Sequence, residues 1–259
     1  MGKIIAVINQ KGGVGKTATT CNLAYCFAER MKKTLLIDMD SSANATNIYT
    51  QTEPDLTLKD FLMDKERGKD ALTVATIKNV GIPFLSLLPS HISIALTARE
   101  ISHKPYREAL LAKKLEATGM LDFFDHIFLD CPPNLNDLTI NAMFCADFIL
   151  VPVTYEKHAL EGVADLFSLL SEIKEGHSYD LKIIRNKFDA RKKTANNFVS
   201  EKLSDLDEQG LVLKTVIRQD EEVNKATIEN QPVITFSPKT GATLDYQNLT
   251  AELGGLFNG

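Results

Sequence analysis

The sequence predicts an α/β fold in which a mostly parallel, twisted sheet carries helices on both faces. Short apolar runs rich in β-branched residues recur along the chain, and a stretch with helical periodicity follows most of them. Parallel strands need crossover connections, which are right-handed and usually helical. No Pro/Gly/Ser-rich linker or internal repeat divides the 259 residues, of which 44% are hydrophobic. We therefore expect residues 1–259 to form a single domain around one large core.

Seven strands and five helices are expected, each to within about two to four residues at its ends. The strands are expected at residues 4–9, 34–39, 84–88, 126–129, 148–153, 181–186 and 213–217. The helices are expected at residues 17–31, 106–118, 136–145, 159–174 and 194–206. Ligands of such sheets bind beyond the carboxyl ends of the strands, where the strand-to-helix loops meet. Residues far apart in sequence should therefore converge on one crevice.

The segment NQKGGVGKT, residues 9–17, joins the first expected strand to the first expected helix. Glycines let successive backbone N–H groups point inward, and the helix start adds partial positive charge, so the segment predicts a phosphate-binding loop. Lys16 would reach the β- and γ-phosphates, and the Thr17 hydroxyl would bind Mg²⁺. A strict P-loop pattern would have glycine at Gln10, and a flexible glycine turn is the alternative. The expected nucleotide-binding residues here are Lys11, Gly12, Gly13, Val14, Gly15, Lys16, Thr17 and Ala18.

Polar residues follow three further strands. Asp38 and Asp40 come at the end of the second strand, and Asp130 ends the fourth, where the following Cys-Pro-Pro stops further pairing. An aspartate at the place of Asp130 is expected to hold Mg²⁺ through a water molecule. Asn186 ends the sixth strand, and its carboxamide can both donate to and accept from an adenine edge. The alternatives are structural: carboxylates that cap loop amides, and an asparagine that forms a turn.

The net charge, the cysteine spacing and the length of the apolar runs argue against several classes of function. The net charge of -5 argues against a surface coated with positive charge, although a local basic patch within a Debye length of about 10 Å can still bind a phosphate backbone. The cysteines form no CxxC pair and have no histidine at ligand spacing, so reduced core thiols are expected rather than a metal or disulfide site. The apolar runs are far shorter than the ~20 residues that span a bilayer, and the N-terminus resembles a strand more than a signal peptide. A cytoplasmic protein is expected.

The segments NQKGGVGKT, LLIDMDSSANAT and FLDCPP resemble those of the deviant Walker A ATPases of the ParA/MinD class, and the whole chain is similar to the ParA, Soj-like branch. The resemblance implies a single-domain P-loop NTPase fold that hydrolyses ATP with Mg²⁺. It implies that Lys11 crosses a dimer interface to the partner's phosphates and that Asp40 orients or activates the attacking water. It also implies that Asn186 contacts adenine. The resulting catalytic set is Lys11, Lys16 and Asp40, and the metal set is Thr17, Asp38 and Asp130.

The same resemblance implies a biological task. The ATP-bound homodimer would bind DNA without sequence preference, and a ParB-like partner would stimulate slow hydrolysis, so that a plasmid or chromosome is segregated on the nucleoid. Asp220, Glu221 and Glu222 add more acid near the basic residues than is usual in the family, and solvated helix faces without a ligand are the alternative. The expected DNA contacts are Lys187, Arg191, Lys192, Lys193, Lys214, Arg218 and Lys225.

Four other functions are alternatives for this sequence. A ParA-like protein can position a protein cargo with the same ATPase, and a biosynthetic ligase can share the fold. A MinD-like membrane-associated ATPase should end in a basic amphipathic helix, whereas residues 248–259 hold no Lys or Arg and are expected to be interrupted at Gly254 and Gly255. An electron-transfer ATPase resembling nitrogenase iron protein needs paired cysteines in contexts that Cys131 and Cys145 do not match. The phosphate loop begins too early for a preceding helix-turn-helix domain, so none is expected.

Overall fold

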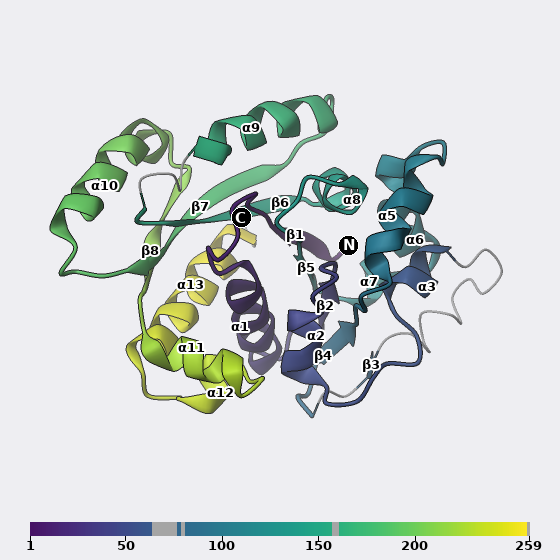
Figure 1. Ribbon diagram of the computed structural model, residues 1–259, viewed down its shortest axis with the longest axis horizontal. Helices are drawn as coiled ribbons and strands as arrows, with labels where there is room; N and C mark the ends of the chain where they lie inside the picture. The colour runs from purple at the N-terminus through teal and green to yellow at the C-terminus, as the bar shows by residue number, and fades with distance from the viewer. Residues whose placement is uncertain (64–76, 79–80, 157–160, 258–259) are drawn as a thin grey trace.

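The computed structural model describes residues 1–63, 77–78, 81–156 and 161–257 (Figure 1). Its central layer is one eight-stranded sheet with the order β3-β4-β2-β5-β1-β6-β7-β8. All pairings are parallel except that of β3 with β4 at one edge. The seven predicted strands are all present, and β3 is the addition. The strands are β1 (Lys3–Val7), β2 (Thr34–Asp38), β3 (Ile77–Lys78), β4 (Leu85–Leu88), β5 (His126–Asp130), β6 (Phe148–Thr154), β7 (Asp180–Phe188) and β8 (Val212–Arg218).

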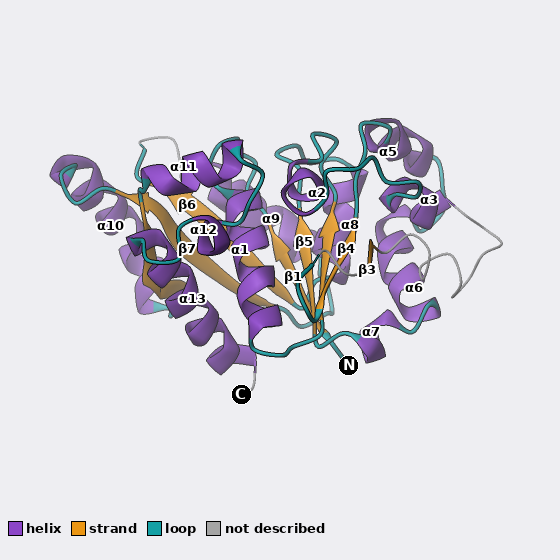
Figure 2. Ribbon diagram, turned by 90° about the horizontal axis from the view of Figure 1, so that it is seen from below, coloured by secondary structure: helices purple, strands orange, loops and turns teal. Residues whose placement is uncertain are grey.

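Helices cover both faces of this sheet, as predicted (Figure 2). One face carries α1 (Lys16–Glu29), α2 (Asn44–Tyr49), α11 (Glu221–Ile228), α12 (Val233–Phe236) and α13 (Gly241–Phe257). The other carries α3 (Leu58–Met63), α5 (Ile94–Ser102), η1 (Arg107–Ala109), α6 (Leu110–Ala117), α7 (Met120–Phe123), α8 (Asp137–Cys145), α9 (Glu161–Ile173) and α10 (Lys193–Glu208). The predicted start of α9 at residue 159 lies outside the described residues.

The core is divided by the sheet into two apolar clusters. Successive side chains of a strand point to opposite faces, so Ile4 and Ala6 of β1 join the cluster under α8 and α9, whereas Ile5 and Val7 join the cluster under α1 and α13. This two-sided burial explains why the strands appear in the sequence as continuous apolar runs. Each fully buried large side chain contributes about 1.5–3 kcal/mol of transfer free energy.

The structure corrects the predicted bounds of one helix and one strand. The predicted helix at 106–118 begins as a short 3₁₀ turn, because Tyr106 has a left-handed backbone with φ of 57°. The strand predicted to end at Asn186 continues to Phe188, so Asn186 lies inside β7; a register irregularity follows, and Lys187 has φ of 56°.

The expected interruption at Gly254 and Gly255 is wrong, because α13 passes through both glycines. Its buried side chains, among them Tyr246 and Leu249, pack against α1 and β8, and this tertiary packing outweighs a glycine cost of about 1 kcal/mol each. None of the described helices has both the length and the apolar character needed to cross a membrane.

Candidate nucleotide site

The phosphate loop leaves β1 and enters α1 through backbone conformations that favour glycine. Gly13 has φ of 75° and Gly15 has φ of 90°, in the left-handed region. Gly15 is the residue before the helix, and no side chain of the described residues caps the first backbone N–H groups of α1. The first turn of α1 also carries no acidic residue. The free N–H groups and the positive end of the helix dipole therefore form a site for an anion.

A buried asparagine holds the start of this loop in place. The Asn9 Oδ1 accepts a hydrogen bond from the Lys11 backbone N at 2.8 Å, and the Asn9 Nδ2 donates to the Pro152 backbone O of β6 at 2.8 Å. Asn9 is 3% exposed, and its bond to Pro152 is buried while that from Lys11 is partly buried. This role of Asn9 was not predicted, although its position directly after a buried strand was a usable signal.

The two lysines of the loop lie in different surroundings. The Lys16 Nζ donates to the Lys11 backbone O at 3.1 Å, and Lys16 is 8% exposed. Burial lowers the Lys16 pKa, while the charges of Asp130, Cys131 and Asp40 act in the opposite direction. The Lys11 ammonium instead contacts the carboxylate of Glu156 in the same chain. The Lys16 ammonium is therefore directed into its own loop, whereas that of Lys11 is held outside it, and the contact of Lys16 with the phosphates stays a prediction.

Two buried carboxylates lie side by side where β2 and β5 end, because Asp38 is paired with Asp130 in the sheet register. Burial raises the Asp130 pKa, and the nearby charge of Asp38 raises it further, while hydrogen bonds from Thr17 and Thr20 oppose the shift. The Thr20 Oγ1 donates to the Asp130 Oδ1 at 3.3 Å, whereas the buried Asp130 Oδ2 has no hydrogen-bond partner among the described residues. An unpaired buried carboxylate oxygen is suited to a cation or its bound water.

The two aspartates of the β2–α2 loop have distinct contacts. Asp38 Oδ1 accepts from the Asp40 N at 3.0 Å, and its Oδ2 accepts from the Thr46 N and Oγ1, both at 2.8 Å. Burial raises the Asp38 pKa, although these hydrogen bonds lower it. The Asp40 Oδ1 accepts from the N and Oγ of Ser42, both at 2.9 Å. Asp38 thus supports the loop that presents Asp40, and its place near Mg²⁺ stays a prediction.

The described side chains of this site do not by themselves form a complete metal-binding site. Within the described ranges, no cluster of three or more His, Cys, Asp or Glu side chains could hold a metal ion. Mg²⁺ characteristically takes one or two carboxylates and completes its shell with water and substrate phosphates. The donor set of Thr17 and Asp130 fits that mode, because it leaves most of the coordination to other ligands.

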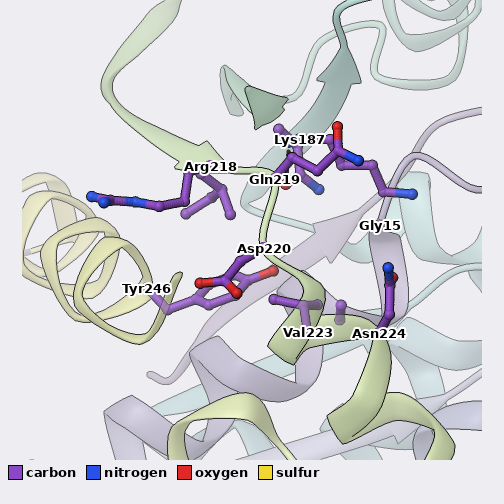
Figure 3. A pocket seen from close by; sticks show the side chains of 11 residues that line it. Gly15, Lys187, Arg218, Gln219, Asp220, Val223, Asn224 and Tyr246 are labelled. Atoms are coloured by element: carbon purple, nitrogen blue, oxygen red, sulfur yellow. Dashed lines mark hydrogen bonds between the residues drawn. The ribbon is translucent and has the colours of Figure 1, made fainter. Parts of the chain in front are cut away.

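A cavity of about 60 Å³ lies beside the phosphate loop (Figure 3). The Asn186 Nδ2 donates to the Val14 backbone O at 2.8 Å, and its Oδ1 accepts from the Lys187 N at 2.8 Å. The carboxamide therefore joins β7 to the phosphate loop, and its expected contact with adenine stays a prediction. One wall of the cavity is formed by residues that follow β8, and this contribution to the site was not predicted, although the strand itself was. The cavity is lined by Gly15, Ala18, Asn186, Lys187, Ile217, Arg218, Gln219, Asp220, Val223, Asn224 and Tyr246.

Comparisons with known proteins agree with this geometry. The family model described as "AAA domain" matches residues 2–183. The chain is 33% identical over 258 residues to the sporulation initiation inhibitor protein Soj of Bacillus subtilis, with 98% of each chain covered. This chain belongs to the Soj/ParA family of partition ATPases. It is also 30% identical to the chromosome partitioning protein ParA of Myxococcus xanthus, with 98% of this chain and 88% of that protein covered.

Solved structures share the fold of this Soj/ParA-family chain. A putative plasmid partition protein from Borrelia burgdorferi bound to AMPPNP has a TM-score of 0.79 at 23% identity and covers 99% of this chain and 100% of its own. Cobyrinic acid a,c-diamide synthase from Mycobacterium smegmatis, with an ATP analogue and magnesium, has a TM-score of 0.80 at 23% identity, covering 100% and 96%. MinD from Pyrococcus horikoshii with Mg-ADP has a TM-score of 0.75 at 21% identity, covering 99% of each chain.

The basic residues of this Soj/ParA-family ATPase divide into paired and unpaired groups. Arg191 forms an ion pair with Asp189 at 2.9 Å, Arg218 with Asp245 at 2.7 Å, and Lys225 with Glu222 at 2.7 Å. Figure 3 shows the Arg218 guanidinium directed away from Gly15. Among the basic residues expected to contact DNA, those without a carboxylate partner in the described part of the chain are Lys187, Lys192, Lys193 and Lys214.

Proposed function

We propose that this chain is an ATP-dependent dimerisation switch that segregates a plasmid or chromosome. The ATP-bound homodimer binds DNA without sequence preference, and a ParB-like partner stimulates slow hydrolysis and release. The observation that carries this proposal is the separation of the two loop lysines. Lys16 is buried and directed into its own loop, whereas Lys11 has a 32% exposed side chain on the outside. A lysine placed outside its own phosphate site is available to a second subunit.

The nucleotide is ATP, and its triphosphate occupies the N–H groups at the start of α1 next to Lys16. Phosphoryl transfer asks the protein mainly for positioning and for positive charge around the phosphate oxygens. Mg²⁺, bound through the Thr17 hydroxyl and Asp130, would supply positive charge there. Asp40 orients the attacking water, because its second oxygen is not used by the Ser42 bonds, and Asp38 fixes the Asp40 backbone.

Dimerisation completes the catalytic set. Lys16 supplies one ammonium from the same subunit, and Lys11 of the second subunit supplies another. Nucleotide binding therefore favours the dimer, and loss of the γ-phosphate removes part of the charge that attracts Lys11. Hydrolysis then releases the subunits, and a partner protein that stabilises the transition state sets the timing.

The DNA surface of the dimer lies around the carboxyl end of β7. Lys187, Lys192 and Lys193 are exposed, and Lys187 lines the cavity beside the phosphate loop. A dimer presents this patch twice, and each neutralised phosphate adds to the salt dependence of binding. The dimer is cytoplasmic and associates with the nucleoid only when ATP holds the two copies of the patch together.

Two rival tasks fit the contacts less well. A MinD-like membrane helix needs a free apolar face, whereas the end of α13 packs inward, with the Phe257 ring 5.7 Å from that of Phe27. An iron-sulfur cluster shared between subunits needs surface cysteines, whereas Cys131 is 1% exposed and lies next to Asp130. Positioning of a protein cargo would use the same ATPase cycle and differs only in the partner.

Light scattering with and without Mg-ATP tests the proposed switch. The wild-type chain is expected to be monomeric without nucleotide and dimeric with AMPPNP. Lys16→Ala should lose nucleotide binding, whereas Lys11→Ala should still bind nucleotide but remain monomeric. A Lys11→Ala variant that dimerises like the wild type would contradict the crossing role of this lysine.

A further inference from the structure

Glu156 pairs with Lys11, the lysine that crosses to the second subunit in the proposed function. It follows β6, and its carboxylate contacts the Lys11 ammonium across 145 positions of the sequence. The side chains are 32% exposed for Lys11 and 66% exposed for Glu156. The pair is therefore open to solvent, and a competing anion can reach Lys11 without unfolding of the surrounding chain.

The backbone next to Lys11 is fixed, so only its side chain needs to move. The Lys11 N donates to the Asn9 Oδ1, and the Asn9 Nδ2 donates to the Pro152 O of β6. The Gln10 side chain also lies beside Gly162 at the start of α9, where a Cβ added to the glycine would be 3.8 Å from the Gln10 Cβ. These contacts keep the loop next to the segment that carries Glu156. The carboxylate is thus a competitor for Lys11 at a constant, high local concentration.

Glu156 still lies near positively charged side chains after Lys11 has moved away from it. The hydrogen bond from Lys11 is the main cause of its lowered pKa, and the charges of Lys187 and Lys192 lower the pKa as well. Breaking the Lys11 pair therefore leaves the carboxylate near two other cations in water, rather than isolated in an apolar environment. The contact is weak enough to exchange and specific enough to hold Lys11 in the monomer.

We infer that Glu156 is a positioning residue that competes with the triphosphate of the second subunit for Lys11 and so sets the concentration at which the nucleotide-bound dimer forms. This inference rests on the proposed function, in which Lys11 crosses to the partner. An exposed ion pair shifts an equilibrium by up to about fivefold. Each subunit breaks one such pair when the dimer forms. Removal of the carboxylate charge should therefore lower the dimer dissociation constant by roughly 2- to 25-fold.

The test is the dimer dissociation constant of Glu156→Gln with AMPPNP, measured by sedimentation over a range of protein concentrations. The variant should dimerise at lower concentration than the wild type, while its monomer binds AMPPNP with unchanged affinity. Added salt should reduce the difference between the two proteins, because it screens the pair that only the wild type has. Glu116→Gln, an equal charge change on the surface of α6, should leave the dissociation constant unchanged.

The results that would contradict the role of Glu156 differ from those that would contradict the proposed dimerisation switch. A Glu156→Gln dimer that is equally tight or weaker than the wild-type dimer would overturn the competition, and the proposed switch would stand if Lys11→Ala still abolished dimerisation. A wild-type chain that stays monomeric with AMPPNP would overturn both. A Glu116→Gln effect of the same size would attribute the change to net charge and likewise overturn the role of Glu156.

Discussion

Gly15 and Asn186 lie against each other where the phosphate loop meets β7. Gly15 has φ of 90°, and a Cβ added to it would lie inside van der Waals contact of the Asn186 Nδ2. The Asn186 Nδ2 also donates to the neighbouring Val14 O at 2.8 Å. At this position, glycine is required both by backbone conformation and by the close approach of another side chain. Small changes here should affect the whole nucleotide site.

Gly15→Ala should therefore lose nucleotide binding and destabilise the fold by about 1–3 kcal/mol, which is the usual cost of strained backbone. Gly255→Ala in α13 is the matched control, because it lies outside the phosphate loop, no described atom lies within 4 Å of its added Cβ and its φ is not in the left-handed region. Thermal unfolding and a fluorescent ATP titration check both variants. Equal behaviour of the two would show that the Gly15 contact does not shape the site.

Asp130 is a buried carboxylate that costs stability when no cation is bound. Burial raises its pKa, and its Oδ2 has no hydrogen-bond partner in the part of the chain that the structure describes. Asp130→Asn should therefore stabilise the nucleotide-free protein by about 1–3 kcal/mol at neutral pH, and should lose the extra stabilisation given by Mg-ATP. Asp122→Asn, at an exposed position, should change stability by less than about 0.5 kcal/mol. Destabilisation of the nucleotide-free Asp130→Asn variant would contradict this role.

The amino end of β5 is packed between α1 and α13 by an aromatic group. The His126 ring lies 4.5 Å from that of Phe27 and 5.5 Å from that of Phe257, measured between ring centroids. Burial lowers the His126 pKa to about 4, with Lys32 and Lys3 adding to the shift and Asp125 opposing it. The folded chain therefore holds this histidine neutral at physiological pH, and its protonation would place a charge among apolar side chains.

This depressed pKa makes the fold sensitive to acid. Between the ordinary histidine pKa of about 6.5 and the folded value of about 4, the unfolded chain binds the extra proton, so His126 lowers stability as pH falls through this window. At pH 5 the loss relative to pH 7.5 is about 2 kcal/mol. His126→Phe should remove that part of the loss, and urea unfolding of both proteins at the two pH values measures the difference. An identical pH dependence in the two proteins would exclude His126 as its source.

Lys192 and Lys193, two of the unpaired lysines of the expected DNA surface, lie where the chain passes from β7 into α10. Replacing Lys192 and Lys193 together with alanine should weaken binding of the AMPPNP dimer to DNA of any sequence and reduce its dependence on salt, because each lost phosphate contact lowers the salt slope by about 0.9. Lys225→Ala is the control, since Glu222 already pairs with that lysine at 2.7 Å. Filter binding at several salt concentrations measures both. A loss confined to the Lys225 variant would place the DNA surface on α11 instead.

Across the whole molecule, the sequence predicted every parallel strand of the sheet but missed the edge strand β3 and several helices on both faces. Strands buried on both faces produce continuous apolar runs, so all seven predicted strands were confirmed. The predictions omitted α2, α3, α5, α7, α11, α12 and α13. The longest of these, α13, packs against α1 and β8, and local periodicity does not report such tertiary packing. The long-range Lys11–Glu156 pair was also beyond a search for local motifs, because only the folded chain brings β6 next to the phosphate loop.

In the proposed cycle, ATP joins two copies of this chain through their phosphate loops. Asp40→Ala isolates this step, because loss of the water-orienting carboxylate should suppress hydrolysis without removing any group that binds the triphosphate. The mass of this variant is measured by light scattering before and after addition of Mg-ATP. We expect a monomer that becomes a long-lived dimer and returns to monomer when Lys11→Ala is added to the same chain. A nucleotide-bound Asp40→Ala variant that stays monomeric would show that ATP does not join the subunits.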